Sequence, residues 1–420
     1  MITELKLKGV GSAPQFNLEL ADRLNIFTGD NGLGKTFLLD VVWYCLTGTW
    51  IDNPEFPQLN ENPPGISYRF INQINGNSVM VESYFDFEQQ KWRYIAFPVL
   101  PKSLVIYARV DGGFSVFDTA RNVSTAYNSR NVSTAYNFSQ YTLWNGLKGE
   151  QNKVLCNGLI QDWVKWQNQP DRTTFQLLSR VIEKLSPHPN EWMEPGEPMR
   201  VSVEDVRDIP TIKMPYGTVP VIHASAGMKR ILGLAYLLVW TWYEHLQASK
   251  LRKRQPTDQI ILLMDEVESH LHPQWQRSIM PAVLEVAKGL QAQMKIQSFV
   301  TTHSPLVLAS FEPIINEEID RLFLFELQGQ EVMLNEFPWT KQGDTVGWLT
   351  SEIFGLKQAR SKEAEITIEA AEAWMRGDSM NDFPENLRTQ SQIQQELERL
   401  LPGHDPFWPR WVVTAEQRRA

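Results

Sequence analysis

The chain has 420 residues, of which 42% are hydrophobic and 21% are charged, and this composition excludes an intrinsically disordered protein. The formal net charge of −9 excludes a protein that coats nucleic acid through overall positive charge. Direct nucleic-acid contact is left to one local run, Lys250, Arg252, Lys253 and Arg254, although short charge runs are usually solvated loops. Without a secretory leader or an apolar run long enough to span a bilayer, we expect a soluble cytoplasmic protein with no membrane partner.

Strand and helix patterns alternate along most of the chain. Alternating or continuous apolar residues predict strands, and longer apolar stretches predict helices. Strands are expected at 2–8, 24–28, 259–264 and 297–301, and helices at 36–46, 225–250 and 273–290. A β-rich stretch at 78–110 and a helical stretch at 150–195 lie between the first two helices, and residues beyond about 330 are expected to be helical. The order predicts an α/β protein.

Residues 112–150 are rich in Asn, Ser, Thr and Gly, and they contain the sequence RNVSTAYN twice, at 121–128 and 130–137. Two adjacent copies cannot form a stacked repeat protein, which needs several units. We interpret them as a local duplication in a surface loop.

The sequence GDNGLGKT at 29–36 is a complete phosphate-binding loop between a predicted strand and a predicted helix. Glycines allow successive backbone N–H groups to point at a polyphosphate, and the following helix contributes its positive end. The residues expected to bind the nucleotide are Asp30, Asn31, Gly32, Gly34, Lys35, Thr36 and Phe37.

Three further motifs follow in a characteristic order. Ser225 and Gly227 begin a predicted helix, Asp265 and Glu266 end an apolar strand, and His303 ends the next strand. Each alone has an ordinary interpretation as a helix cap, an acidic strand end or a strand-terminal histidine. Behind a phosphate-binding loop, their order favours a single nucleotide site.

Together these motifs resemble the ABC-type ATPases of the RecF/SMC/OLD kind, and most of all the stand-alone ATPase subunits of bacterial anti-phage defence systems of the Septu type. The resemblance rests on GDNGLGKTFLLD, ASAGMKRILGLAYLLVW, IILLMDEVESHLHPQWQ and FVTTHSPLVLAS. It implies an ABC-type P-loop NTPase domain at 1–330, with a mixed or antiparallel β subdomain and a loop and helical insertion at about 112–215. Residues 331–420 would form a mostly helical C-terminal region.

The resemblance also implies roles for individual residues. Lys35 would contact the β- and γ-phosphates of ATP, and Thr36 and Asp265 would hold Mg²⁺. Glu266 would polarise the attacking water, and His303 would sense the γ-phosphate.

Ser225 and Gly227 match the signature that completes the ATP site of a second subunit. This implies a head-to-tail homodimer, or a higher homo-oligomer, around two ATP molecules. The signature here is SAGMK and not the transporter-like SGGQ, which places the chain outside transporter subunits. The Q-loop glutamine stays open among Gln73, Gln89, Gln90 and Gln161.

For function, the resemblance implies an ATPase that regulates a separate effector nuclease or toxin. About 90 residues follow the last predicted core strand and show no paired-acid nuclease motif, so we expect the effector, an HNH or TOPRIM protein, on another polypeptide. Two alternatives remain: a RecF-like DNA repair ATPase that binds DNA directly, and a nucleotide-locked scaffold that holds a toxin.

Overall fold

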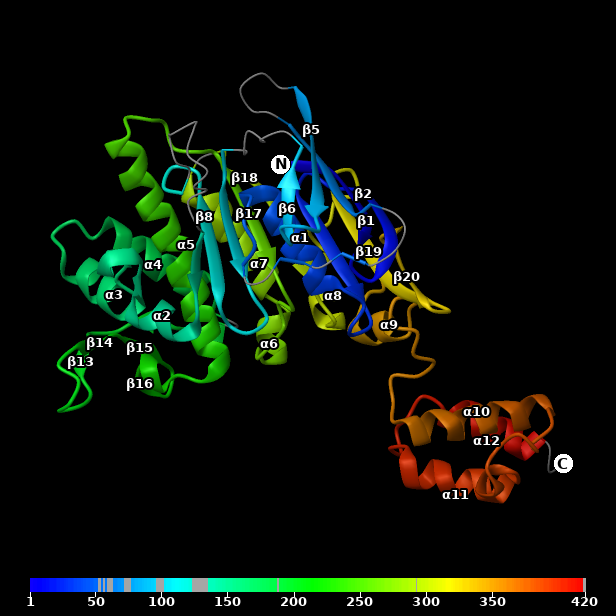
Figure 1. Cartoon of the computed structure of the whole chain (residues 1–420). Helices are drawn as coiled ribbons and strands as arrows, with labels where there is room; N and C mark the ends of the chain where they lie inside the picture. The colour runs from blue at the N-terminus through cyan, green and yellow to red at the C-terminus, as the bar shows by residue number, and fades with distance from the viewer. Residues whose placement is uncertain are drawn as a thin grey trace. The chain divides into compact units, whose positions relative to one another are not determined.

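The computed structural model of the chain contains two compact units, Met1–Gly343 and Asp344–Ala420 (Figure 1). The structure describes residues 1–51, 54–55, 57–58, 63–71, 77–95, 102–122, 135–186, 189–291 and 293–417. No helix in these ranges is long and apolar enough to cross a membrane.

The centre of the first unit is an eight-stranded mixed sheet with the order β20-β19-β3-β18-β17-β7-β8-β9. Its strands are β3 (Leu24–Gly29), β7 (Leu104–Ala108), β8 (Phe114–Asp118), β9 (Tyr136–Phe138), β17 (Gln259–Met264), β18 (Lys295–Thr301), β19 (Asp320–Gln328) and β20 (Glu331–Phe337). The neighbours from β19 to β7 run parallel, whereas β20, β8 and β9 pair antiparallel at the two edges. The carboxyl ends of β3, β17 and β18 therefore meet at one edge of the sheet, where open α/β sheets bind ligands.

A second, antiparallel sheet of five strands has the order β2-β1-β4-β5-β6. Its strands are β1 (Ile2–Val10), β2 (Ala13–Glu19), β4 (Gly65–Ile71), β5 (Ser78–Asp86) and β6 (Lys91–Tyr94). The helix α1 (Lys35–Thr47) lies between the two sheets (Figure 1). Trp43 of α1 packs against Tyr107 of β7, and the next residue, Tyr44, stacks on Tyr94 of β6. Residues 38–39 and 41–47 of α1 are all buried, as expected for a helix covered on several sides.

A helical lobe lies against the side of the main sheet formed by β7, β8 and β9 (Figure 1). Its long helix, α5, packs on the sheet edge, where the ring of Trp240 meets that of Phe138 on β9 edge-on. On α5, Tyr236 also packs against Trp166 of the lobe. The lobe contains α2 (Gln140–Asn145), α3 (Leu159–Asn168), α4 (Thr173–Lys184), α5 (Ala226–Leu251), the 3-10 turns η1 (Glu150–Asn152), η2 (Pro189–Glu191) and η3 (Val221–His223), and the short strands β10 (Leu147–Lys148), β11 (Val154–Cys156), β12 (Glu194–Pro195), β13 (Met199–Arg200), β14 (Asp208–Ile209), β15 (Thr211–Met214) and β16 (Gly217–Pro220).

The helix predicted at 273–290 is divided in the structure into α6 (Pro273–Gln276) and α7 (Ile279–Leu290). Pro281 has no N–H and cannot donate to the carbonyl of Arg277, so a continuous helix would lose a bond at this point. A short helix, α8 (Pro305–Phe311), follows the strand β18.

The second unit is helical, with α9 (Thr345–Leu349), α10 (Lys362–Arg376), η4 (Glu385–Leu387), α11 (Gln390–Leu400) and α12 (Trp408–Gln417). Its core is built around Trp411, which packs against Trp374. The expectation of helices from about 330 is wrong for β20, which pairs with β19 and buries Val332 and Leu334 on one face. The first unit therefore continues to Gly343.

The loop expected at 112–150 is also partly wrong, because β8, β9 and α2 lie within it. Most of the RNVSTAYN duplication, residues 123–134, lies outside the described residues. Its ends are packed: the guanidinium of Arg121 lies over the rings of Tyr136 and Trp240, at 4.5 and 4.9 Å. Two residues near the ends of the duplication, Arg121 and Tyr136, therefore contact each other, and Arg121 also contacts Trp240 of α5.

Candidate functional site

The glycine loop joins β3, which ends at Gly29, to α1, which begins at Lys35. Gly29 has a φ of 127°, and a Cβ built on it would lie 2.2 Å from the carbonyl oxygen of Phe325 on β19. Only glycine fits this close approach of two strands. Residues 30–32 are exposed, so the loop presents its backbone to solvent at the N-terminus of α1, where anions bind.

Lys35 closes the loop on itself. Its Nζ donates to the carbonyl of Gly29 at 3.0 Å and to that of Asp30 at 2.6 Å. Burial lowers the pKa of Lys35, and the charges of Glu266 and Asp30 act in the opposite direction. The ammonium group therefore sits within the loop, bonded to carbonyls that a phosphate oxygen can replace.

Asp265, at the end of β17, is held by two hydroxyl groups. Thr36 Oγ1 donates to Asp265 Oδ2 at 2.8 Å, and Thr301 Oγ1 donates to Oδ1 at 2.6 Å. Burial raises the pKa of Asp265, and these two bonds oppose the increase. The structure thus brings together the two predicted magnesium ligands, Thr36 and Asp265, both with hard oxygen atoms of the kind that Mg²⁺ prefers. In the described part of the chain no cluster of three His, Cys, Asp or Glu forms a protein-only metal site, so Mg²⁺ here would also need phosphate and water oxygens.

Glu266 has a backbone conformation that is rare for residues other than glycine, with a φ of 41°. Its N–H donates to Thr301 Oγ1 at 2.8 Å, and its carboxylate accepts the hydroxyl of Ser269 at 3.1 Å. Strained residues of this kind concentrate at functional sites. The conformation turns the backbone sharply at the end of β17.

His303, which follows the end of β18, faces Glu266 and the glycine loop. Its Nε2 lies 3.9 Å from Glu266 Oε1, and its imidazole is hydrogen-bonded to the carbonyl of Gly29. Burial lowers the pKa of His303, and the positive charge of Lys35 lowers it further. Both effects favour the neutral form of the ring.

The two signature residues, Ser225 and Gly227, form their contacts within α5 and with the segment around His270. Ser225 is exposed and caps α5, with its Oγ accepting the N–H of Met228 at 3.3 Å. Gly227 is buried, and a Cβ built on it would lie 2.7 Å from the carbonyl of His270. Within the described residues neither has a hydrogen bond to the glycine loop, Asp265, Glu266 or His303.

Comparisons with known proteins agree with this arrangement. Residues 4–169 match a family model described as "AAA domain", and residues 213–309 match one described as "AAA domain, putative AbiEii toxin, Type IV TA system". The chain is 22% identical over 368 residues to the Septu protein PtuA of Bacillus thuringiensis, with 86% of each protein covered. The chain is thus similar to AAA-domain proteins over two long stretches of its first unit, and to Septu protein PtuA along most of its length.

Shorter stretches resemble two other proteins. One of 97 residues is 36% identical to the Septu protein PtuA of Bacillus mycoides (strain KBAB4) and covers 23% of this chain and 12% of that protein. One of 47 residues is 47% identical to the Retron Ec83 probable ATPase of Escherichia coli and covers 11% and 8%. Among solved structures, the SMC head domain from Thermotoga maritima is similar with a TM-score of 0.41 and 15% identity, covering 80% of this chain and 99% of that one. The recombination mediator protein RecF with ATP is similar with a TM-score of 0.39 and 12% identity, covering 80% of this chain and 97% of that one.

Three residues of this site were not singled out by the sequence. Thr301 bonds both Asp265 and the Glu266 backbone. The Glu268 carboxylate accepts the Thr302 hydroxyl at 2.8 Å and the N–H of His303. Arg230 bonds backbone carbonyls at the end of β17. All lie inside the recognised motifs, but only the folded contacts distinguish them from their neighbours.

Three of the four Q-loop candidates lie within the described residues. Gln73 lies outside the described residues, Gln89 and Gln90 lie in the exposed turn between β5 and β6, and Gln161 is exposed on α3. Tyr107 of β7 lies near Asp265, and its buried hydroxyl is hydrogen-bonded to Asp40 of α1.

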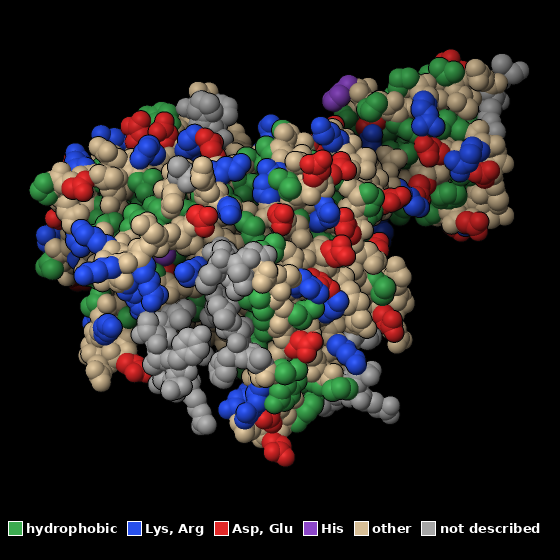
Figure 2. Space-filling view, turned by 90° about the horizontal axis from the view of Figure 1, so that it is seen from above, with side chains coloured by type: hydrophobic (Ala, Val, Ile, Leu, Met, Phe, Trp, Pro, Cys, Tyr) green, Lys and Arg blue, Asp and Glu red, His purple; other side chains and the backbone are tan. Residues whose placement is uncertain are grey.

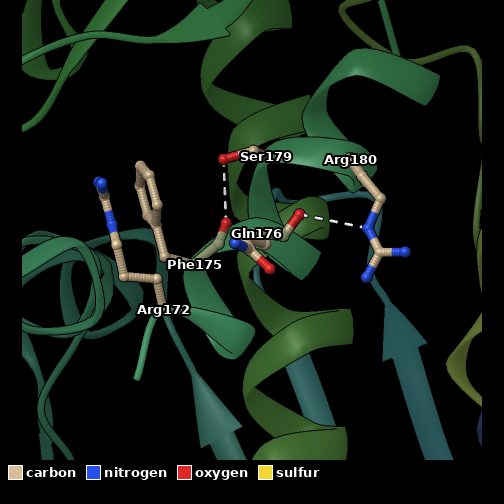
Figure 3. Close-up of a pocket in the computed structure, with 5 residues that line it drawn as sticks. All are labelled: Arg172, Phe175, Gln176, Ser179 and Arg180. Carbon is tan, nitrogen blue, oxygen red and sulfur yellow. Dashed lines mark hydrogen bonds between the residues drawn. The ribbon is translucent and has the colours of Figure 1, made fainter. Parts of the chain in front are cut away.

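Two surface features lie away from the ATPase motifs. A hollow on α4 is lined by Arg172, Phe175, Gln176, Ser179 and Arg180 (Figure 3). Ser179 Oγ and Arg180 Nε donate to carbonyls of their own helix. The basic run at 250–254 is exposed at the end of α5, and basic and acidic side chains are interspersed across the face shown in Figure 2.

Proposed function

We propose that this chain binds ATP with Mg²⁺ at the glycine loop and hydrolyses it. The observation that carries the proposal is the bond from Thr36 to Asp265, two residues 229 positions apart. It supports the assignment of both side chains to one metal-bound phosphate group. When bound there, Mg²⁺ would neutralise charge on the phosphates.

The chain's own groups have matching tasks in this proposal. Lys35 exchanges the carbonyls of Gly29 and Asp30 for phosphate oxygens, and it brings a positive charge to the transferring group. The hydrogen bonds from Thr36 and Thr301 favour the ionised form of Asp265 and oppose the effect of its burial, which raises its pKa.

Glu266 and His303 complete the catalytic set. The Glu266 carboxylate orients the attacking water and accepts its proton as a general base. The imidazole of His303 lies close to Glu266 and the glycine loop, where its N–H would exchange the Gly29 carbonyl for an oxygen of the terminal phosphate.

We propose further that two copies associate head-to-tail around two ATP molecules. Ser225 is exposed at the start of α5, and its hydroxyl, which accepts the Met228 N–H, could donate to a ligand held by another subunit. A helix N-terminus of this kind favours a γ-phosphate. Each ATP would thereby contact both subunits.

The cellular role that we propose is control of an effector nuclease in anti-phage defence by the nucleotide state of the dimer. The similarity to Septu protein PtuA along 86% of both chains supports it. The effector would be a separate HNH or TOPRIM polypeptide. Direct, salt-sensitive DNA binding by the ATPase alone would favour the RecF-like alternative.

Two substitutions test the proposal in the full chain. Lys35→Ala should abolish measurable ATP binding, whereas Glu266→Gln should keep binding and lower turnover by about 10²- to 10⁴-fold. Glu266→Gln should also accumulate an ATP-dependent dimer, seen by light scattering. The matched control is Glu285→Gln, an exposed acid on α7. Full turnover in Glu266→Gln would remove the proposed base.

A further inference from the structure

Arg230 is a half-buried cation on α5 whose hydrogen bonds go to backbone carbonyls. Nη1 donates to the carbonyl of Arg109 at 3.3 Å and reaches that of Val110 at 3.5 Å. Nη2 donates to the carbonyl of Asp265 at 3.2 Å and reaches that of Glu266 at 3.5 Å. Among the described residues, no carboxylate oxygen lies within 4.0 Å of the Arg230 guanidinium nitrogens. Arg230 thus joins the segments that follow β7 and β17.

These bonds act on the two peptide groups that flank Glu266. The peptide between Asp265 and Glu266 is held at both ends, because its carbonyl accepts from Arg230 and its N–H donates to Thr301. The next peptide is held through its carbonyl, which accepts the N–H of Ser269 at 2.8 Å, with Arg230 at the limit of hydrogen-bond distance. Fixing both peptides fixes the φ and ψ of Glu266, and therefore the direction of its side chain.

The same helix carries the signature turn. Gly227 packs against the carbonyl of His270, so the start of α5 also contacts the segment that follows Glu266. A guanidinium has several donors in a rigid fork and stays charged when buried, which suits it to hold carbonyls from two strands at once.

We propose that Arg230 is a positioning residue that holds Glu266 in its catalytic orientation and links it to the signature turn of α5. This rests on the proposed function, in which Glu266 is the base and the signature turn faces the ATP of a partner subunit. Displacement of a catalytic group by about 1 Å can cost about 100-fold in rate. Loss of Arg230 should therefore lower turnover and leave the binding of ATP to Lys35 and Thr36 intact.

The test uses Arg230→Met in the full-length protein, with Arg252→Met as the matched control, an exposed arginine that caps the C-terminus of the same helix. Arg230→Met should lower kcat at least tenfold and keep the affinity for ATP within about twofold of wild type. The dependence of turnover per subunit on protein concentration, which measures dimer formation, should not change. In the Glu266→Gln background it should lower turnover no further, because Arg230 acts through Glu266. A purely structural role would give additive losses and would overturn the proposal.

Other outcomes are also decisive. Arg230→Met with wild-type kcat overturns the proposal. If Arg230→Met does not fold, Arg230→Lys decides: a single ammonium cannot serve both strand ends in the same way, so at least a threefold loss of kcat with unchanged ATP affinity is expected, and unchanged kcat overturns the proposal. If the wild-type protein shows no turnover that Glu266→Gln removes, it is the proposed ATPase function that fails.

Discussion

Thr36 Oγ1 donates a hydrogen bond of 2.8 Å to Asp265 Oδ2, which joins the first turn of α1 to the end of β17. Thr36→Val removes the hydroxyl and keeps the shape of the side chain. Because a hydrogen bond to a charged group contributes about 1.5–3 kcal/mol, we expect the affinity for ATP with Mg²⁺ to fall about 10- to 100-fold. Calorimetric titration with and without Mg²⁺ measures this change.

The control for that prediction is Thr36→Ser, which keeps the hydroxyl and should keep the affinity. Thr36→Val should have little effect on the weaker binding of metal-free ATP, since Lys35 and the glycine loop remain. Equal binding of ATP with Mg²⁺ by Thr36→Val and wild type would contradict the assignment of Thr36 as a metal ligand.

The elements that place these residues follow from local patterns. The strand predicted at 24–28 and the helix predicted at 36–46 correspond to β3 and α1, and the strand predicted at 259–264 is β17. Continuous apolar runs bounded by glycine or acid are strong signals for buried strands, so both ends of the Thr36–Asp265 bond could be located in advance.

The supporting residues could not be predicted in this way. Arg230 stands at the start of an apolar helix, where a charged side chain usually points to solvent, and only the close approach of α5 to β7 and β17 gives it carbonyl partners. The strand β20 was missed because the chain beyond about residue 330 is rich in Gln, Glu and Arg, whereas within β20 Val332 and Leu334 alternate toward the core. Long-range contacts decide both cases.

Glu268 links the segment after β17 to the end of β18. Its carboxylate accepts the hydroxyl of Thr302 and the N–H of His303, and burial raises its pKa. Glu268→Gln replaces one acceptor oxygen by an amide donor, so one of the two buried donors loses its partner. We expect a loss of about 1–3 kcal/mol in the free energy of unfolding of the first unit, and lower turnover as His303 shifts.

Urea unfolding and kcat check that prediction, with Glu285→Gln as the exposed acid control, whose Lys184 partner is also exposed. That control should change the stability by less than about 0.5 kcal/mol. Wild-type stability and turnover in Glu268→Gln would show that its two bonds are dispensable.

His303 should titrate below its ordinary value of 6.5, because burial and then the charge of Lys35 lower its pKa. The folded state disfavours protonation of this ring, so its neutral form adds full stability above pH 6.5, and that stability decreases as the pH falls below 6.5. Lys35→Met removes the second cause and should raise the pKa of His303 toward 6.5.

NMR titration of the histidine ring protons tests this, with the His303 signal identified by its loss in His303→Gln. Arg376→Met, an exposed change in the second unit, is the control and should leave the titration unchanged. A pKa above 6.5 in the wild-type protein, or no increase in Lys35→Met, would contradict the described surroundings of the ring.

In the second unit, Arg360 pairs with both carboxylate oxygens of Asp405, whose side chain is only 5% exposed. The Arg360 hydrogen bonds lower the pKa of Asp405. A lowered carboxyl pKa stabilises the folded state above the ordinary value of 3.8, and this contribution is lost as the pH falls from 3.8 through the folded pKa. Arg360→Met should therefore destabilise the second unit by about 1–3 kcal/mol at pH 7.

Hydrogen exchange of the 360–417 segment, followed by mass spectrometry in the full chain, measures that loss locally. Arg376→Met is the matched control, because Arg376 and its partner Asp378 are both exposed and such pairs contribute about 0–1 kcal/mol. The difference between Arg360→Met and wild type should persist from neutral pH down to 3.8 and shrink below it, since protonated Asp405 no longer needs a cation. A difference that is independent of pH would mean that Arg360 acts through packing of its aliphatic stem and not through the carboxylate.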